Sequence, residues 1–188
     1  MGVTQYSGHM TGLPDRTEAA EFYFTYIGRI TAPDVLRVLE EQLESTPAFL
    51  AKISEEQSLH RYAHGKWSMR EVLNHVADTE RAFAFRALWF ARGFDSPLPG
   101  IDQDIACQGA KANDFTWASH MDDFRAVRQA TLTLFRNLPA DAWMRRGIAS
   151  GNPFTVRALA FITAGHLEHH LAILRERYLR VPAPLNTA

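Results

Sequence analysis

The stretch Gly165-His166-Leu167-Glu168-His169-His170 lies inside a longer run, Val156 to Leu179, in which apolar residues recur at helical spacing. His166 and His170 are four residues apart, so they are neighbours on one face of the expected helix. Because that face also carries the apolar side chains, we expect both imidazoles to point into the core. Two core-facing histidines one turn apart can bind one metal ion.

Three further segments show the same amphipathic period, and no segment alternates as a strand does. Thr31 followed by Pro33 has the form of a helix start, Ser68 to Glu71 is a capping box, and Thr155 is a cap before the histidine run. Pro47 lies inside the first segment and should kink it. The four expected helices span residues 31–53, 68–93, 116–138 and 155–179.

Four amphipathic helices without strands indicate an all-α protein, a four-helix bundle. Residues 94–116 form a long connection between the second and third helices, with a possible short helix over residues 102–110. About 20 residues can extend past ~40 Å, so these two helices can run parallel. The expected organisation is an N-terminal lead-in with an aromatic packing segment (1–30), the bundle (31–180) and a C-terminal tail (181–188).

The composition of the 188 residues is that of a soluble protein, with 46% hydrophobic and 22% charged residues. The 20 basic and 21 acidic residues are well mixed, which argues against a nucleic-acid partner. A single cysteine fits a reducing, cytoplasmic location. No apolar run approaches the ~18 residues needed to span a membrane, and no signal peptide is apparent.

A third ligand for the ion is expected at His75, which we judge to be the only other histidine on an inward helical face. Three imidazoles with an open coordination position are typical of a catalytic metal site rather than a closed structural one. The competing interpretation is a metal-free bundle whose inward histidines are hydrogen-bonded core residues. Spacing alone leaves both interpretations open.

Other candidate groups are few. Arg86, inward on the second helix, is a candidate for binding a carboxylate or the anion of a thiol cofactor, or else for an ion pair with Asp78 or an acid of the long connection. Glu168 should face solvent, which leaves the site without a carboxylate base, and Cys107 has no basic partner and should be inert. Residues 102–104 are polar and either line a pocket mouth or are simply solvated.

Several of these motifs together resemble the DinB-like damage-inducible superfamily. The segment from Gly65 to Arg81, which contains Trp67-Ser68 and Asn74-His75-Val76-Ala77-Asp78, resembles the signature of its second helix. The other similar motifs are Arg92-Gly93, Pro97-Leu98-Pro99-Gly100 with Asp102-Gln103-Asp104, Phe124-Arg125-Ala126-Val127-Arg128, Ala164-Gly165-His166 and His169-His170-Leu171. The resemblance covers about residues 31–179.

The resemblance implies helices in up-down-down-up order, often a homodimer, and a divalent metal, nickel or zinc, on three histidines that match His75, His166 and His170. It points to the branch of thiol S-transferases that use bacillithiol, mycothiol or glutathione, and of mycothiol-dependent maleylpyruvate isomerase. The leading hypothesis is therefore a metal-dependent transferase that activates a low-molecular-weight thiol for attack on a small-molecule electrophile. The alternatives are a metal-dependent hydrolase that uses metal-bound water and a non-enzymatic, stress-induced metal-binding protein.

Overall fold

The computed structural model describes residues 12–179 and is mostly helical. Its helices are α1 (Phe24–Ile27), α2 (Val35–Leu50), α3 (Glu55–Ser58), α4 (Met69–Ala91), α5 (Gln103–Ala110), α6 (Trp117–Arg136) and α7 (Val156–Ile173), and its strands are β1 (Arg146–Ala149) and β2 (Asn152–Thr155). The C-terminal tail and the first part of the expected lead-in lie outside the described residues. Within the described part, no helix has the length and apolar character needed to cross a bilayer.

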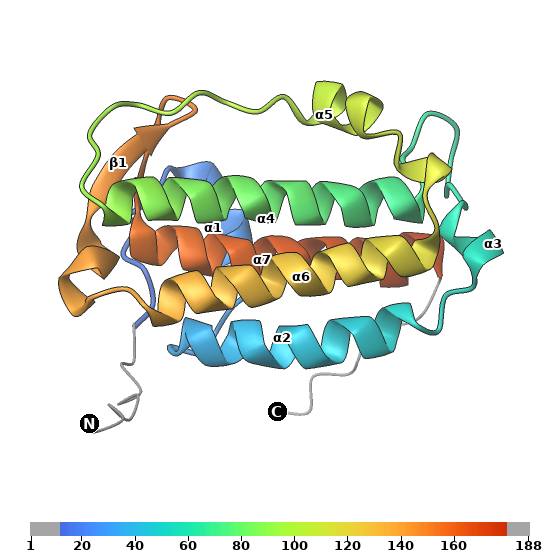
Figure 1. Cartoon of the computed structure of the whole chain (residues 1–188), viewed down its shortest axis with the longest axis horizontal. Helices are drawn as coiled ribbons and strands as arrows, with labels where there is room; N and C mark the ends of the chain where they lie inside the picture. Colours follow the sequence, from blue (N-terminus) through green and yellow to red (C-terminus); the bar gives the residue numbers. More distant parts are fainter. Residues whose placement is uncertain (1–11, 180–188) are drawn as a thin grey trace.

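The four long helices form the predicted bundle in up-down-down-up order (Figure 1). Helices α2 and α7 run in one direction, and α4 and α6 run in the other. Because α4 and α6 are parallel, the chain must return along the whole bundle between them, and residues 92–116 do so with α5 lying on this connection. The prediction of an all-α four-helix bundle with a long second connection is confirmed.

The predicted caps at Ser68 and Thr155 are present, and the third long helix, whose start the sequence places near Thr116 or Ser119, begins after Thr116. Ser68 and Glu71 form both bonds of the capping box at the start of α4, and Thr116 and Thr155 cap α6 and α7. The predicted cap of the first long helix, Thr31, is wrong. The helix begins at Val35, and Asp34 is its cap. Asp34 is extended, and its carboxylate accepts a hydrogen bond from the backbone of Arg37 at 3.2 Å, so the chain is not helical before it.

A β-hairpin was not predicted. Strands β1 and β2 pair antiparallel and are joined by Ser150 and Gly151, whose φ angles of 52° and 72° are both positive. A two-residue turn with two positive φ angles matches the twist of paired strands. The hairpin packs on the end of α4, where a Cβ at Gly147 would overlap the ring of Phe90.

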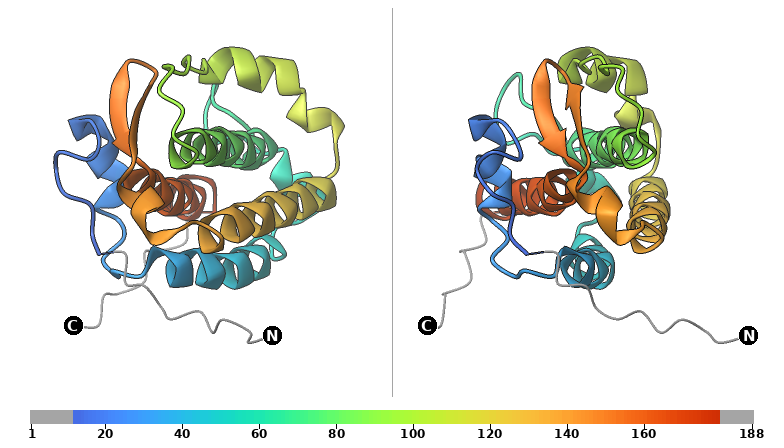
Figure 2. Two further views of the ribbon diagram at one scale, coloured as in Figure 1. Left: turned by 60° about the vertical axis from the view of Figure 1, so that its left-hand side comes forward. Right: turned by 90° about the vertical axis from the view of Figure 1, so that its left-hand side faces the viewer.

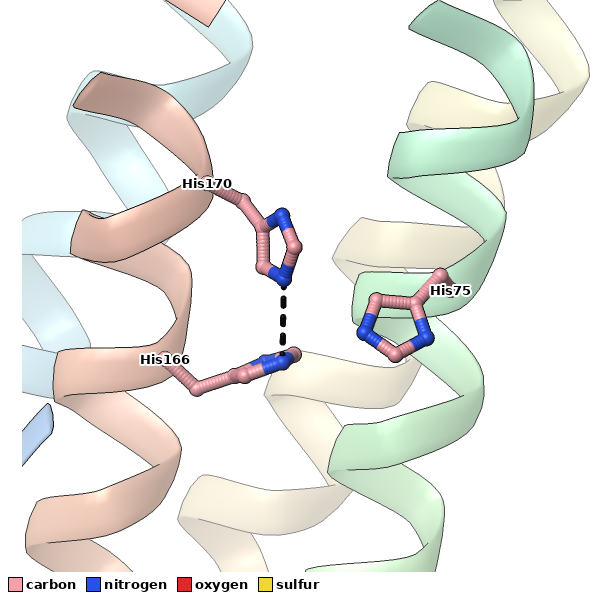
Figure 3. Close-up of side chains that lie close together, drawn as sticks. All are labelled: His75, His166 and His170. Atoms are coloured by element: carbon pink, nitrogen blue, oxygen red, sulfur yellow. Dashed lines mark hydrogen bonds between the residues drawn. The ribbon is translucent and has the colours of Figure 1, made fainter. Parts of the chain in front are cut away.

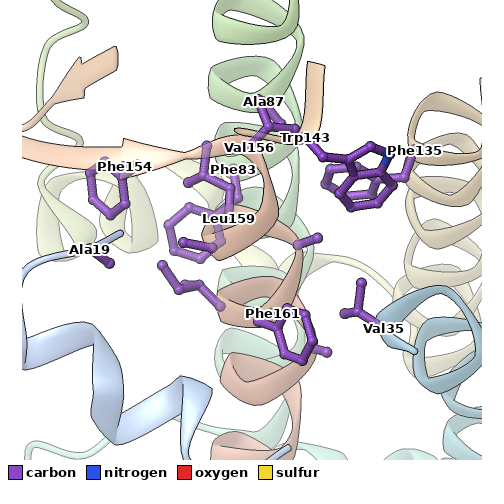
Figure 4. Close-up of a cluster of buried hydrophobic side chains, with 14 of the residues drawn as sticks. Ala19, Val35, Phe83, Ala87, Phe135, Trp143, Phe154, Val156, Leu159 and Phe161 are labelled. Carbon is purple, nitrogen blue, oxygen red and sulfur yellow. The ribbon is translucent and has the colours of Figure 1, made fainter. Parts of the chain in front are cut away.

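Helix α7 lies at the centre of the molecule. Figure 2 shows α1 on its outer side and the hairpin over one end of the bundle. One buried apolar cluster surrounds the first half of α7 and includes Leu159, Phe161 and Phe154 (Figure 4). A second cluster, around Leu73, Phe124 and Leu171, closes the other end. The histidine run therefore lies on a helix that is surrounded by other elements of the fold on most of its faces.

The N-terminal aromatic segment packs against the bundle through α1, with Ile27 buried and Tyr23 and Phe24 partly buried against the core. Phe22 departs from the expected aromatic packing segment, because 63% of its surface is exposed.

Candidate metal centre

Three histidines from two helices converge in the bundle. His75 comes from α4, and His166 and His170 come from α7, as Figure 3 shows. One ring nitrogen from each can be chosen so that all lie within 4.8 Å of one another. The Nε2 atoms of His166 and His170 are 3.1 Å apart, close to the roughly 3.3 Å that separates ligands of a tetrahedral ion at 2.0–2.1 Å. The donor set therefore fits a divalent cation.

The three imidazoles are neutral at physiological pH. Burial lowers the pKa of His75 to about 4 and, with the neighbouring histidines, lowers the pKa of His170 to about 3. The pKa of His166, which is almost fully buried, is also lowered well below its ordinary value by burial and by His170. Neutral imidazoles keep a lone pair for coordination, so protons do not compete with a cation near pH 7.

Aromatic rings surround the histidines. The ring of Trp67 lies 5.0 Å from His75, and those of Tyr26 and Phe83 lie 5.2 and 6.0 Å from His166. The hydroxyl of Thr79 is 3.4 Å from Nδ1 of His75, at the long end of a hydrogen bond. This mostly apolar shell restricts water around the three imidazoles and limits the orientations of their rings.

A pocket of about 430 Å³ opens beside the centre. We call it the histidine pocket, and its wall includes His75, His166, Tyr26, Phe83, Cys107 and Arg86. Because two of the three histidines line it, a molecule in the pocket can reach an ion held by them. Cys107 was expected to be inert, and burial does raise the pKa of its thiol, but its place in the pocket wall was not foreseen.

Arg86 lies on the pocket wall but makes no ion pair with Asp78, contrary to one of the two expectations for it. Asp78 pairs with Arg81 at 3.1 Å. Arg86 instead donates a hydrogen bond to the hydroxyl of Ser150 at 2.9 Å and a longer one to the carbonyl of Pro99 at 3.4 Å. Ser150 was missed by the sequence analysis because the hairpin that carries it was missed.

Glu168 is half-buried rather than fully exposed, which corrects a second expectation in part. Its carboxylate accepts a 2.8 Å hydrogen bond from the side chain of Gln42. Gln42 in turn accepts a hydrogen bond from Arg128, which is fully buried and paired with Glu80. Glu168 thus belongs to a polar network on the other side of α7 and is held away from the pocket.

Two other carboxylates line hollows beside the histidines. Asp78 lines the histidine pocket, and burial raises its pKa. Asp104 lines a second hollow together with Gln103 and His170, and its charge acts to raise the pKa of His75. Residues 103–104 of the connection are therefore at the site, whereas Asp102 caps α5.

His75 is not the only inward histidine beyond α7, because His120 on α6 is also buried. Its Nε2 lies 2.8 Å from the carbonyl of Ala112, so it holds the end of the long connection against α6. Helical phase alone could not separate this hydrogen-bonded core histidine from a member of the cluster. His169 is half-buried against Tyr26 and lies outside the group of three.

Comparisons with known proteins agree with this architecture. No curated protein matches the chain. Among solved structures, YfiT from Bacillus subtilis, described as a probable metal-dependent hydrolase with an unusual four-helix bundle topology, superposes with a TM-score of 0.68. The two chains are 17% identical over 89% of this chain and 91% of YfiT, so the likeness concerns the fold. A family profile described as the DinB superfamily matches residues 38–174, most of the chain and all three clustered histidines. The protein belongs to the DinB superfamily.

Proposed function

We propose that His75, His166 and His170 bind a divalent cation, nickel or zinc, and that the histidine pocket is an active site. The observation that carries this proposal is the convergence of three neutral imidazoles on the wall of a pocket. Three protein ligands leave a further coordination position for a substrate, as in catalytic rather than structural sites.

We propose further that the reaction is transfer of a low-molecular-weight thiol to an electrophile. A divalent cation held by the three histidines would lower the pKa of a coordinated thiol, so that the thiol would lose its proton near neutral pH. The sulfur would form a bond to the electrophilic carbon as the leaving group departs, and the thiol proton would go to solvent. The protein's part is to hold both molecules: Tyr26 and Phe83 pack against their apolar portions, and Arg86 binds an anionic group of the thiol or of the electrophile.

A second candidate is a hydrolase in which water replaces the thiol. Two observations favour it. Asp78 and Asp104 bring carboxylates near the histidines, and a raised pKa, as at Asp78, suits a group that takes up a proton. YfiT, which shares the fold, is described as a probable metal-dependent hydrolase. Against it, neither carboxylate is tied to the histidines by a hydrogen bond in the described residues.

The deciding experiment compares thiol transfer with hydrolysis in the metal-loaded protein. Bacillithiol, mycothiol and glutathione are each offered with 1-chloro-2,4-dinitrobenzene, and an ester panel is offered without thiol. We expect thiol-dependent release of chloride that is lost in His75→Ala and retained in His64→Ala, whose histidine is exposed. Ester turnover without thiol, lost in His75→Ala, would replace the transferase by the hydrolase. If the protein still holds the ion but shows neither activity, a non-enzymatic metal-binding protein is favoured.

Two further expectations accompany this function as proposals. We propose that the protein is cytoplasmic, because its only cysteine is free and thiol cofactors are reduced there. We also propose a homodimer, which light scattering at several concentrations tests directly: a mass near 21.2 kDa would show a monomer.

A further inference from the structure

Among the described residues three arginines are buried, and one differs from the other two. Arg70 pairs with Glu55, and Arg128 is held by both oxygens of Glu80. Arg86 is 6% exposed, yet it has no carboxylate within 4.0 Å in the described part of the chain. Burial lowers the pKa of its guanidinium, but arginine starts so far above neutral pH that the charge persists.

The neighbours of Arg86 are neutral oxygens. They belong to the hydroxyl of Ser150, the carbonyl of Pro99 and the phenol of Tyr23. A buried charge without a counter-charge is costly, whereas a buried guanidinium matched by a planar carboxylate is compensated. Because Arg86 lies on the wall of the histidine pocket, the missing counter-charge can come from a ligand.

Ser150 is placed to act with Arg86. It is one of two non-glycine residues with positive φ among the described residues, at 52°, in the turn of the hairpin. A hydroxyl that accepts from a guanidinium still has its own hydrogen to donate. Ser150 also lines the pocket, so an anion at Arg86 would meet donors from both side chains.

The distance between this position and the histidines limits the ligand. The guanidinium carbon of Arg86 lies 5.8 Å from the centre of the Phe83 ring, which lies 6.0 Å from the His166 ring. Arg86 and His166 are therefore no more than about 12 Å apart, the sum of these two distances. The wall between them includes the apolar or aromatic side chains of Tyr26, Phe83 and Ile101.

From these observations we infer that Arg86 and Ser150 form a carboxylate-binding subsite, and that the substrate or thiol spans at most about 12 Å, with a carboxylate at one end, an apolar middle, and its reacting group at the histidines. One guanidinium balances one carboxylate. A phosphate would bring nearly a second negative charge into a pocket that already contains Asp78. This inference names the ligand class for the site proposed above and rests on that function.

The subsite is tested first in metal-free protein, so that coordination plays no part. Calorimetry measures binding of 4-phenylbutyrate and of its neutral amide. We expect the acid to bind more tightly and Arg86→Met to weaken the acid about 10- to 100-fold, the effect of a charge-assisted hydrogen bond, without changing the amide. Ser150→Gly, which keeps the turn, should cost about 3- to 10-fold. Exposed Arg92→Met is the matched control.

Two further measurements distinguish a loss of binding from misfolding of a variant. Circular dichroism confirms that each variant is folded, and Arg86→Lys, which keeps the charge but loses the planar fork, should bind the acid with intermediate strength. Equal binding of acid and amide by the wild type, or loss of acid binding in Arg92→Met equal to that in Arg86→Met, would overturn the subsite.

A second arm separates the subsite from the proposed function. Cobalt-loaded protein is titrated with ω-mercaptocarboxylates of two to eight carbons and with their amides, and the thiolate-to-metal charge-transfer band is followed. We expect the acids to bind best at one chain length, with a preference that Arg86→Met removes. If acids and amides give the same band with equal affinity, the subsite is wrong and the metal–thiol proposal stands. If no thiol gives the band while Arg86-dependent acid binding persists, the subsite stands and the thiol proposal fails.

Discussion

The backbone carbonyl of Tyr26 packs directly against Gly165 in α7, so closely that a Cβ at position 165 would overlap it. This contact brings α1 onto α7 and sets the Tyr26 ring 5.2 Å from the His166 ring. The glycine next to the first clustered histidine is therefore the place where the N-terminal segment docks and completes one wall of the histidine pocket.

Gly165→Ala should destabilise the protein, although alanine is ordinarily the better helix former by about 1 kcal/mol. The added methyl meets backbone, which cannot rotate away, and we expect a loss of about 1–3 kcal/mol in the free energy of unfolding. Denaturant unfolding measures it. Gly109→Ala is the matched control, because a Cβ there meets nothing within 4 Å in another helix; it should be neutral or stabilising. Equal stability of the two variants would contradict the docking role of Gly165.

Most of the fold could be predicted because the long helices carry their own signals. The capping residues before α4, α6 and α7 satisfy backbone donors locally, and the apolar period tells which face is inward without knowledge of the partner helix. His75, His166 and His170 could be nominated for the same reason. Helical phase places each of them on an inward face, and family resemblance joins them into one site.

The remaining features depend on contacts between distant segments. The strands of the hairpin have four residues each, too few for an alternating pattern to be recognised. The packing of Gly147 on Phe90 cannot be deduced from the sequence of either segment alone. The partner of Arg86 could not be deduced without that hairpin. The angle of Glu168 on α7 predicts exposure, but the side chain is half-buried and accepts a hydrogen bond from Gln42 of α2.

Removing one partner of the buried Glu80–Arg128 pair should be strongly destabilising. Arg128 is 0% exposed and donates hydrogen bonds to both carboxylate oxygens of Glu80 at 2.8 Å, so Glu80→Ala leaves a buried charge without a partner. We expect a loss of about 3–5 kcal/mol. The control is Asp123→Ala, which breaks the surface pair with Arg81 and should cost under ~1 kcal/mol. Similar costs for the two variants in urea unfolding would show that the buried network contributes no more than a surface pair.

Metal loading should stabilise the fold through the three histidines. A cation that binds only the native state adds about 2.7 kcal/mol at a free concentration 100 times its dissociation constant, or roughly 5–10 °C in Tm for a chain of this size. We expect nickel or zinc to raise the Tm of the wild type and of His64→Ala and a chelator to reverse it. His170→Ala should show no metal-dependent shift. A full shift in that variant would place the ion elsewhere.

The stability of the metal-free protein should fall as the pH drops below 6.5. Burial lowers the pKa of His75 to about 4 and of His170 to about 3, so between these values and 6.5 the unfolded chain binds protons that the folded chain does not. Each of these two histidines then contributes a loss on the order of 1 kcal/mol between pH 7.5 and 5.5. His170→Gln should reduce the total loss by that amount. Urea unfolding across this range, with chelator present, measures the loss in both proteins, and an unaltered pH dependence in His170→Gln would show that this imidazole titrates normally in the folded protein.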